Sequence, residues 1–251
     1  MIVPFVSALS NYLTEASIAF NRFTYEIASF SHLIGMKNIL AVFIALISVF
    51  SISVHAHNLF PDKPKRSYVH VKSKVDSLKH SCRKMSLKKS GELFSRYIDE
   101  KIVPHWIGTP WDYNGVTQKP GEGKIACGYF VTTVLRDAGV KINRVKMAQC
   151  ASETMINSLT KVKVNYSALS FDNFIAKVKA KGKGLSIIGL DNHTGFLYND
   201  GLELWFIHSS YVGTGAVAKE KANDNLILKH SKYKVVGFIS HDANFMKRWM
   251  L

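Results

Sequence analysis

The sequence has few cysteines, few acidic residues and no long hydrophobic run. Only three of its 251 residues are cysteine, and no two of them form a Cys-x-x-Cys pair, so a structural zinc site has little support. The longest apolar run, 38–50, is shorter than the ~20 residues that a transmembrane helix needs. The sequence shows no internal repeat and no low-complexity tract. With 47% hydrophobic and 20% charged residues, the composition is that of an ordinary globular protein.

The scarcity of acidic residues leaves a strongly basic chain. Against 33 lysines and arginines there are 18 aspartates and glutamates, which gives a formal net charge of +15. Nucleic acid, anionic cell-wall polymer and membrane headgroups all attract such a surface, and the charge alone does not choose among them.

The N-terminal segment narrows that choice. Met36 and Lys37 precede the apolar run, and Val54-His55-Ala56 suits signal peptidase, which is the order of a secretory signal. We predict that residues 1–35 are a non-native upstream extension and that residues 36–56 are a signal peptide. Residues 57–75 are then a basic mature arm, and residues 76–251 form the folded domain. The alternative is a membrane anchor over 38–54. A secreted or periplasmic basic protein meets cell wall and lipid first, so we expect no nucleic-acid partner.

The odd number of cysteines matters in an oxidising compartment. At least one thiol stays unpaired unless it pairs between chains. Cys82 with Cys150 is one pairing, and it would leave Cys127 free.

Hydrophobic periodicity places helices in the first half of the domain and strands in the second. We predict a helix over 91–103 with Ser90 as its N-cap and Pro104 as its end, because apolar residues recur there at helical spacing. Further helices are predicted over 127–138, 146–160 and 170–181, and strands over 185–190, 193–198, 203–208 and 232–240. The order predicts an α+β fold with an antiparallel sheet.

Cys127 and two histidines have the arrangement of a thiol-based active site. Cys127 stands where a glycine-rich loop becomes an apolar helix, and a helix N-terminus lowers a thiol pKa and binds an oxyanion. His193 and His208 are separated by a hairpin turn at Asn199-Asp200-Gly201, so strand pairing can bring them side by side. A thiol nucleophile needs an imidazole base, which in turn needs a polar group to orient it. The alternatives are a buried structural thiol and two unrelated surface histidines.

Several segments in this order resemble the NlpC-type family of papain-like cell-wall cysteine peptidases. The segments are Gly108–Gly115, Ile125–Val131, Val134–Val140, His193–Tyr198 and Phe206–Ser210. They correspond to the family's G-T-P-Y-x-Y-G-G, D-C-S-G-F-V, a helix ending in A-G-[IV], H-V-G-I-Y and F-I-H-A-S. The resemblance implies a nucleophile helix packed on an antiparallel sheet, with an extra N-terminal helix here. It also implies Cys127 as nucleophile, His193 as base, His208 as orienting residue, and no metal or organic cofactor.

The resemblance further implies amide cleavage in peptidoglycan stem peptides or small peptides, by a monomeric enzyme. Trp111, Asp112, Tyr113 and Gly128 are the predicted substrate-binding residues. Ala126 and Gly128 replace the family's Asp and Ser beside the nucleophile, which affects substrate preference. Two alternatives therefore stay open: a lipid or acyl amidase or acyltransferase of the same superfamily, and a non-catalytic basic wall-binding protein.

Overall fold

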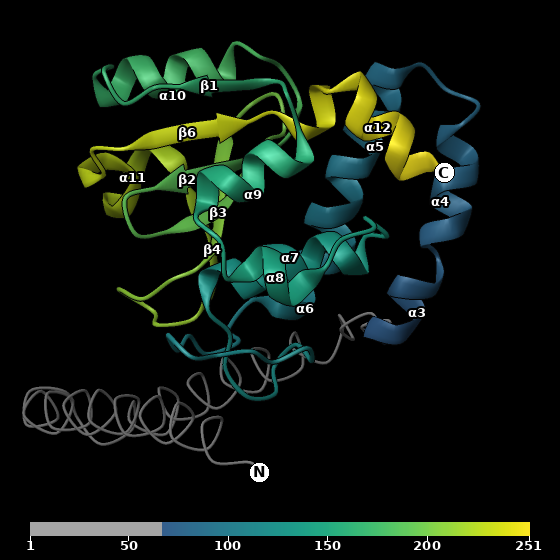
Figure 1. The fold of residues 1–251 in the computed structure, drawn as a ribbon, viewed down its shortest axis with the longest axis horizontal. Helices are drawn as coiled ribbons and strands as arrows, with labels where there is room; N and C mark the ends of the chain where they lie inside the picture. The colour runs from purple at the N-terminus through teal and green to yellow at the C-terminus, as the bar shows by residue number, and fades with distance from the viewer. Residues whose placement is uncertain (1–66) are drawn as a thin grey trace, which may run out of the picture. The chain divides into compact units, whose positions relative to one another are not determined.

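Six antiparallel strands form one open sheet in the computed structural model, which describes residues 67–251 (Figure 1). The spatial order is β1-β6-β2-β3-β4-β5. The strands are β1 (Lys163–Asn165), β2 (Gly184–Leu190), β3 (Thr194–Asn199), β4 (Leu204–Ser209), β5 (Val217–Lys221) and β6 (Lys234–Gly237). The predicted α+β class and the hairpin of β3 and β4 are confirmed, whereas β1 and β5 were not predicted. Those two strands are short or polar, with lysines at several positions, and so lack the hydrophobic alternation that marks a strand.

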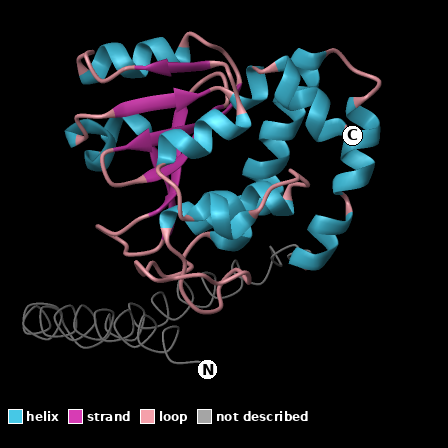
Figure 2. Cartoon of the chain, in the orientation of Figure 1, coloured by secondary structure: helices cyan, strands magenta, loops and turns pink. Residues whose placement is uncertain are grey.

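The central strands are buried on both faces because helices cover both sides of the sheet (Figure 2). Neighbouring residues alternate between two hydrophobic clusters, as Phe196 and Leu197 do on β3 and Ile207 and Phe206 do on β4. One cluster contains side chains of α5, α7, α9 and α12, and the other contains side chains of α10 and α11. This is why β2 and β3 are buried along their whole length.

The α-helices are α3 (Tyr68–Ser73), α4 (Val75–Cys82), α5 (Leu87–Tyr97), α6 (Val103–Trp106), α7 (Cys127–Asp137), α8 (Arg144–Ala148), α9 (Ser152–Leu159), α10 (Phe171–Lys179), α11 (Leu226–His230) and α12 (Ala243–Met250). Short 3₁₀ turns lie at Ala222–Asp224 and Ile239–His241. The predicted helices over 127–138 and 170–181 correspond to α7 and α10. The prediction over 146–160 is wrong in detail, because residues 149–151 separate α8 from α9.

The predicted ends of the 91–103 helix are wrong. The N-cap is Ser86, whose hydroxyl accepts from the N–H of Lys89, and Ser90 lies inside α5 with its hydroxyl donating to the Cys82 carbonyl. A π-helical segment at Ile98–Ile102 follows α5, and α6 then continues the chain past Pro104. Pro104 is tolerated because it lies in the first turn of α6, where its missing N–H needs no helical partner.

Three further predictions concern the N-terminus and the cysteines. The upstream extension and the signal peptide lie outside the described residues. The predicted arm over 57–75 reaches too far, because α3 begins at Tyr68 and belongs to the folded unit. The disulfide between Cys82 and Cys150 is not formed: Cys82 is buried beneath α5, and all three thiols are free.

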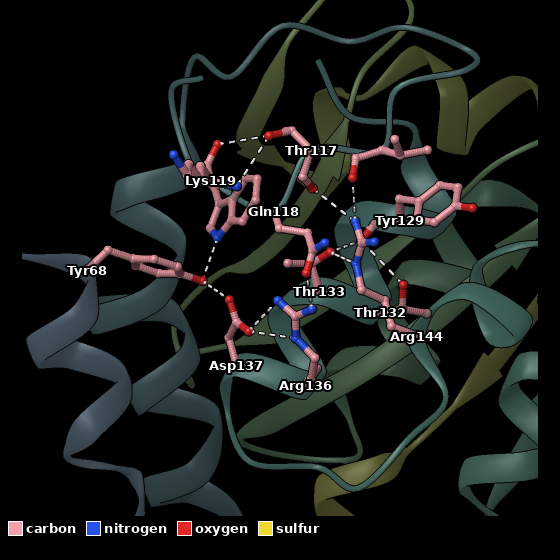
Figure 3. Close-up of polar contacts among 12 residues, drawn as sticks. Tyr68, Thr117, Gln118, Lys119, Tyr129, Thr132, Thr133, Arg136, Asp137 and Arg144 are labelled. Carbon is pink, nitrogen blue, oxygen red and sulfur yellow. Dashed lines mark hydrogen bonds and ion pairs between the residues drawn. The ribbon is translucent and has the colours of Figure 1, made fainter. Parts of the chain in front are cut away.

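Tyr68 shows why α3 belongs to the folded unit (Figure 3). Its hydroxyl donates to the Asp137 carboxylate on α7 at 2.7 Å and accepts from the Trp106 indole at 2.8 Å. Asp137 also forms an ion pair with Arg136 at 2.8 Å. The last turn of α7 is thereby fixed to the N-terminal helices.

Helix α7 lies against β3 and β4 and starts at the loop that carries most of the predicted substrate-binding residues. Its apolar side chains Phe130, Val131, Val134 and Leu135 are fully buried. Gly139 ends the helix with φ of 81°, a backbone conformation that favours glycine. The cysteine therefore stands at the open end of a helix whose axis is fixed by the sheet.

Arg144 ties the preceding loop to α7 (Figure 3). Its guanidinium donates to the carbonyls of Val116 and Thr117 at 2.9 Å each and to the Thr133 hydroxyl at 2.7 Å. It also lies 4.7 Å from the ring centroid of Tyr129. Since the side chain is buried, it satisfies carbonyl groups that water reaches poorly.

We expect Arg144→Met to lower the free energy of unfolding by about 1–3 kcal/mol, because it leaves two loop carbonyls without donors. Urea denaturation measures this, and limited proteolysis should show earlier cleavage within residues 112–125. Lys146→Met, at an exposed position of the same helix, is the matched control. Equal stability and equal cleavage of the two variants would contradict this role of Arg144.

Candidate active site

The thiol of Cys127 lies among free N–H groups at the start of α7. The N-cap residue Ala126 has no side chain that can cap the helix, and the first intrahelical bond runs from the Phe130 N–H to the Ala126 carbonyl. The main-chain N–H groups of Cys127 and Gly128 act on the thiol instead and lower its pKa. The N-terminus of α7 is therefore left open at the thiol.

Two contacts place Cys127 beside the strands that carry the histidines. The main-chain N–H of Thr194, the residue after His193, acts on the thiol and lowers its pKa. Ser209, the residue after His208, donates its hydroxyl to the Ile125 carbonyl at 2.7 Å, two residues before the cysteine. The start of α7 thus meets the beginning of β3 and the end of β4.

His193 and His208 form a buried pair. Nε2 of His193 lies 2.8 Å from Nδ1 of His208, and both side chains are almost completely buried. Phe206 stacks on the His208 ring with centroids 4.0 Å apart. Gly195 makes room for this arrangement, because a Cβ there would lie 2.7 Å from Phe206 and 2.9 Å from the Cβ of His208.

The second nitrogen of each histidine has a different environment. Nε2 of His208 lies 2.9 Å from the Glu220 carboxylate on β5. Nδ1 of His193 has no hydrogen-bond partner, and within residues 67–251 it is the only buried side-chain nitrogen or oxygen without one. A buried polar atom without a partner costs free energy, so its presence at this place points to a function.

Burial governs the protonation of these groups. It lowers the pKa of His193 to about 3, and the neighbouring His208 acts in the same direction. Burial also lowers the pKa of His208, although the Glu220 carboxylate opposes this. The pKa of Cys127 is raised by burial, which outweighs the N–H groups that lower it. The expected low thiol pKa is therefore not found, and the resting pair is a neutral thiol with a neutral imidazole.

An aromatic wall stands beside the histidine pair. The ring of Tyr211, in the β4–β5 loop, lies 5.2 Å from the His193 ring in an edge-on contact. The Trp111 ring lies 6.0 Å from Tyr211, and the Trp111 N–H donates to the Gly215 carbonyl at 2.7 Å. Trp111 is therefore connected to His193 only indirectly, by its contact with Tyr211.

The other predicted substrate-binding residues lie in different surroundings. The Asp112 carboxylate accepts from the Asn114 N–H and pairs with Lys124 at 3.0 Å. Tyr113 is 81% exposed. Gly128 is buried, and a Cβ on it would lie 2.5 Å from the Ala148 carbonyl oxygen, so close packing with α8 accounts for the glycine. Its N–H nevertheless faces the thiol.

Sequence reasoning missed Glu220 and Tyr211. Glu220 lies on a strand that reads Val-Ala-Lys-Glu-Lys, where an acidic residue between lysines gives no signal. Tyr211 follows the motif block that ends at Ser210, and proximity in sequence to His208 was the only available hint.

Residues 67–251 contain neither a metal-binding cluster nor a membrane-spanning helix. Between residues 67 and 251 no group of three or more histidine, cysteine, aspartate or glutamate side chains is arranged to hold a metal ion. No helix in that same range is long and apolar enough to cross a membrane.

Comparison with known proteins adds no family assignment to this geometry. No protein-family model matches the chain. No curated protein matches it either. Membership of the NlpC-type family therefore stays a prediction that rests on the sequence segments around Cys127, His193 and His208.

Proposed function

We propose that this protein is a cysteine hydrolase that cleaves amide bonds, with Cys127 as nucleophile and His193 as base. One observation carries the proposal: the main-chain N–H of Thr194, next to His193, acts on the Cys127 thiol, and Nδ1 of His193 is buried without a partner. A thiol and an unpartnered imidazole nitrogen at adjoining positions are what nucleophilic catalysis requires. Catalytic hydrogen bonds often tighten only when substrate binds, so the absence of a direct bond here does not oppose the role.

In the proposed reaction, Sγ attacks the amide carbonyl carbon while its proton moves to Nδ1 of His193. The new C–S bond pushes the carbonyl electron pair onto oxygen, where the N–H groups of Cys127 and Gly128 stabilise the charge. Collapse of this intermediate breaks the C–N bond, and the proton on Nδ1 passes to the leaving amine. Water, with His193 again as base, then hydrolyses the thioester to a carboxylate and restores the thiol.

A peptidoglycan stem peptide is the proposed substrate. The sequence segments that resemble the wall peptidases surround the thiol and both histidines. The net charge of +15 suits an enzyme that works on an anionic wall or membrane surface. A secreted or periplasmic location and a monomeric state belong to the same proposal.

A second candidate, a lipid or acyl amidase or acyltransferase, has its own support. Asp112, the acidic residue expected to bind a substrate amine, already pairs with Lys124. The aromatic ring next to His193 is that of Tyr211, and Trp111 packs against Tyr211 in turn. These two rings suit an apolar acyl group.

The full chain should release new amine ends from purified peptidoglycan or muropeptides. We expect Cys127→Ser and His193→Gln each to lower the rate by about 10²-fold or more, because each removes a group that moves in the reaction. A parallel panel of acyl-amides and lipids, read by mass spectrometry, separates the two substrate classes.

Cys150→Ser is the matched control, because Cys150 is another free and partly buried thiol. It should keep the activity of the unaltered protein. If Cys127→Ser were as active as Cys150→Ser on every substrate cleaved, the proposed nucleophile would be wrong.

The pH dependence should reflect a neutral resting pair. Since the pKa of His193 is lowered to about 3, the imidazole remains an acceptor at pH 5, and the acid limb of kcat/KM should lie well below the ordinary ~6.5. Since the pKa of Cys127 is raised, its alkylation by iodoacetamide should still be rising above pH ~8.5. An alkylation rate that is already constant between pH 5 and 7 would instead indicate a thiolate–imidazolium pair.

Tyr211→Ala should raise KM by about 2- to 10-fold, the range of one aromatic contact, with a smaller effect on kcat. Tyr113→Ala is the comparison, because the sequence predicts Tyr113 in the cleft whereas its side chain is largely exposed. Steady-state kinetics on the substrate identified above measure both variants. A larger KM change for Tyr113→Ala would mean that the substrate binds on the other side of Trp111.

A further inference from the structure

Glu220 and Asn225 terminate a chain of hydrogen bonds that leads back to His193. Asn225 is the N-cap of α11, and its Oδ1 accepts from the Leu228 N–H at 3.0 Å. Its Nδ2 donates to Oε2 of Glu220 at 2.7 Å. The same Oε2 lies 2.9 Å from Nε2 of His208, which is 0% exposed.

The N-cap of α11 and the Glu220 carboxylate together fix the direction of the bonds in this chain. Because the Leu228 N–H can only donate, the Asn225 oxygen must face it and the amide nitrogen must face Glu220. Oε2 of Glu220 therefore accepts from Asn225. The contacts with His208 and Asn225 also lower the pKa of Glu220, so its ionised carboxylate can only accept from His208, whose proton lies on Nε2. A neutral His208 then offers the lone pair of Nδ1, so Nε2 of His193 carries a proton and donates.

This direction has one consequence at the thiol. With its proton on Nε2, neutral His193 has a free lone pair on Nδ1, the buried atom without a partner. In the opposite direction Nδ1 would carry the proton and could not act as a base. Burial keeps both rings neutral, because it lowers the pKa of His193 and the pKa of His208.

We propose that Glu220, held by the N-cap Asn225, is a positioning residue that sets the tautomers of His208 and His193 so that Nδ1 of His193 is the base. The role rests on the proposed function for its catalytic consequence, but the tautomers exist without substrate. Glu220 acts through His208 and touches neither the thiol nor a substrate in this arrangement.

The tautomers can be read directly in the full chain labelled with ¹⁵N-histidine, by long-range ¹H–¹⁵N correlation. His193→Gln and His208→Gln assign the two rings. We expect the proton on Nε2 of both rings in the unaltered protein and in Glu220→Gln, because a glutamine oxygen can still accept from Asn225 and His208. Glu220→Met removes the acceptor and should change the tautomer of at least one ring.

Activity should follow the tautomers. We expect kcat to fall by about 10²-fold or more in Glu220→Met, with KM nearly unchanged, and by less than about 10-fold in Glu220→Gln.

Asn225→Asp gives a second test, because aspartate can still cap α11 but sets a carboxylate against Glu220. It should lower kcat at neutral pH and recover as one carboxylate is protonated at lower pH. Glu203→Met, at the residue just before β4, is the control and should leave the tautomers and kcat unchanged.

The outcomes separate this inference from the proposed function. Unchanged tautomers in Glu220→Met, or a proton on Nδ1 of His193 in the unaltered protein, would overturn the role of Glu220 even if Cys127 proves catalytic. Conversely, the expected tautomer changes in a protein that cleaves no substrate would support the role of Glu220 and contradict the hydrolase.

Discussion

The contact between two buried imidazoles, Nε2 of His193 and Nδ1 of His208, is the constraint around which the site is built. Two neutral rings withdrawn from water must satisfy each other, and each has a second nitrogen to account for. His208 meets this need through Glu220, whereas His193 does not. The atom left without a hydrogen-bond partner is therefore Nδ1 of His193, at the beginning of β3.

Contacts from β3, β4 and the neighbouring loop fix the position of the N-terminus of α7 beside the two histidines. Thr194 and Ser209 fasten the strands to the thiol and to the segment just before it, and α7 is fixed at its far end by Asp137 and Tyr68. Arg144 binds the loop between Trp111 and Cys127. The site is thus formed by loops that are anchored at several points to a buried sheet.

What the sequence could predict followed from local patterns. The β3–β4 hairpin was predictable because its apolar residues alternate around an Asn-Asp-Gly turn, and α7 because its apolar face ends at Gly139. The π segment at Ile98–Ile102 has no such pattern, so Pro104 looked like a helix end when it lies inside α6. Glu220 depends on the register between β4 and β5, a long-range pairing that no local pattern encodes. The predicted direction of the Cys127 pKa shift was wrong for a related reason. The sequence shows that the thiol stands at a helix N-terminus, which lowers its pKa, but it does not show the burial that raises it, because burial depends on the whole fold.

Gly195 has a consequence for how this arrangement can vary among proteins. A Cβ on the glycine would lie within 3 Å of the Phe206 ring, the Ile207 carbonyl oxygen and the Cβ of His208, so a side chain there would displace the part of β4 that carries the second imidazole. The sizes of four residues are therefore coupled: His193 and Gly195 on one side, and Phe206 and His208 on the facing strand β4. A protein that retains both histidines but carries a bulkier residue in place of this glycine would have to shift the facing strand, and with it the contact between the two rings.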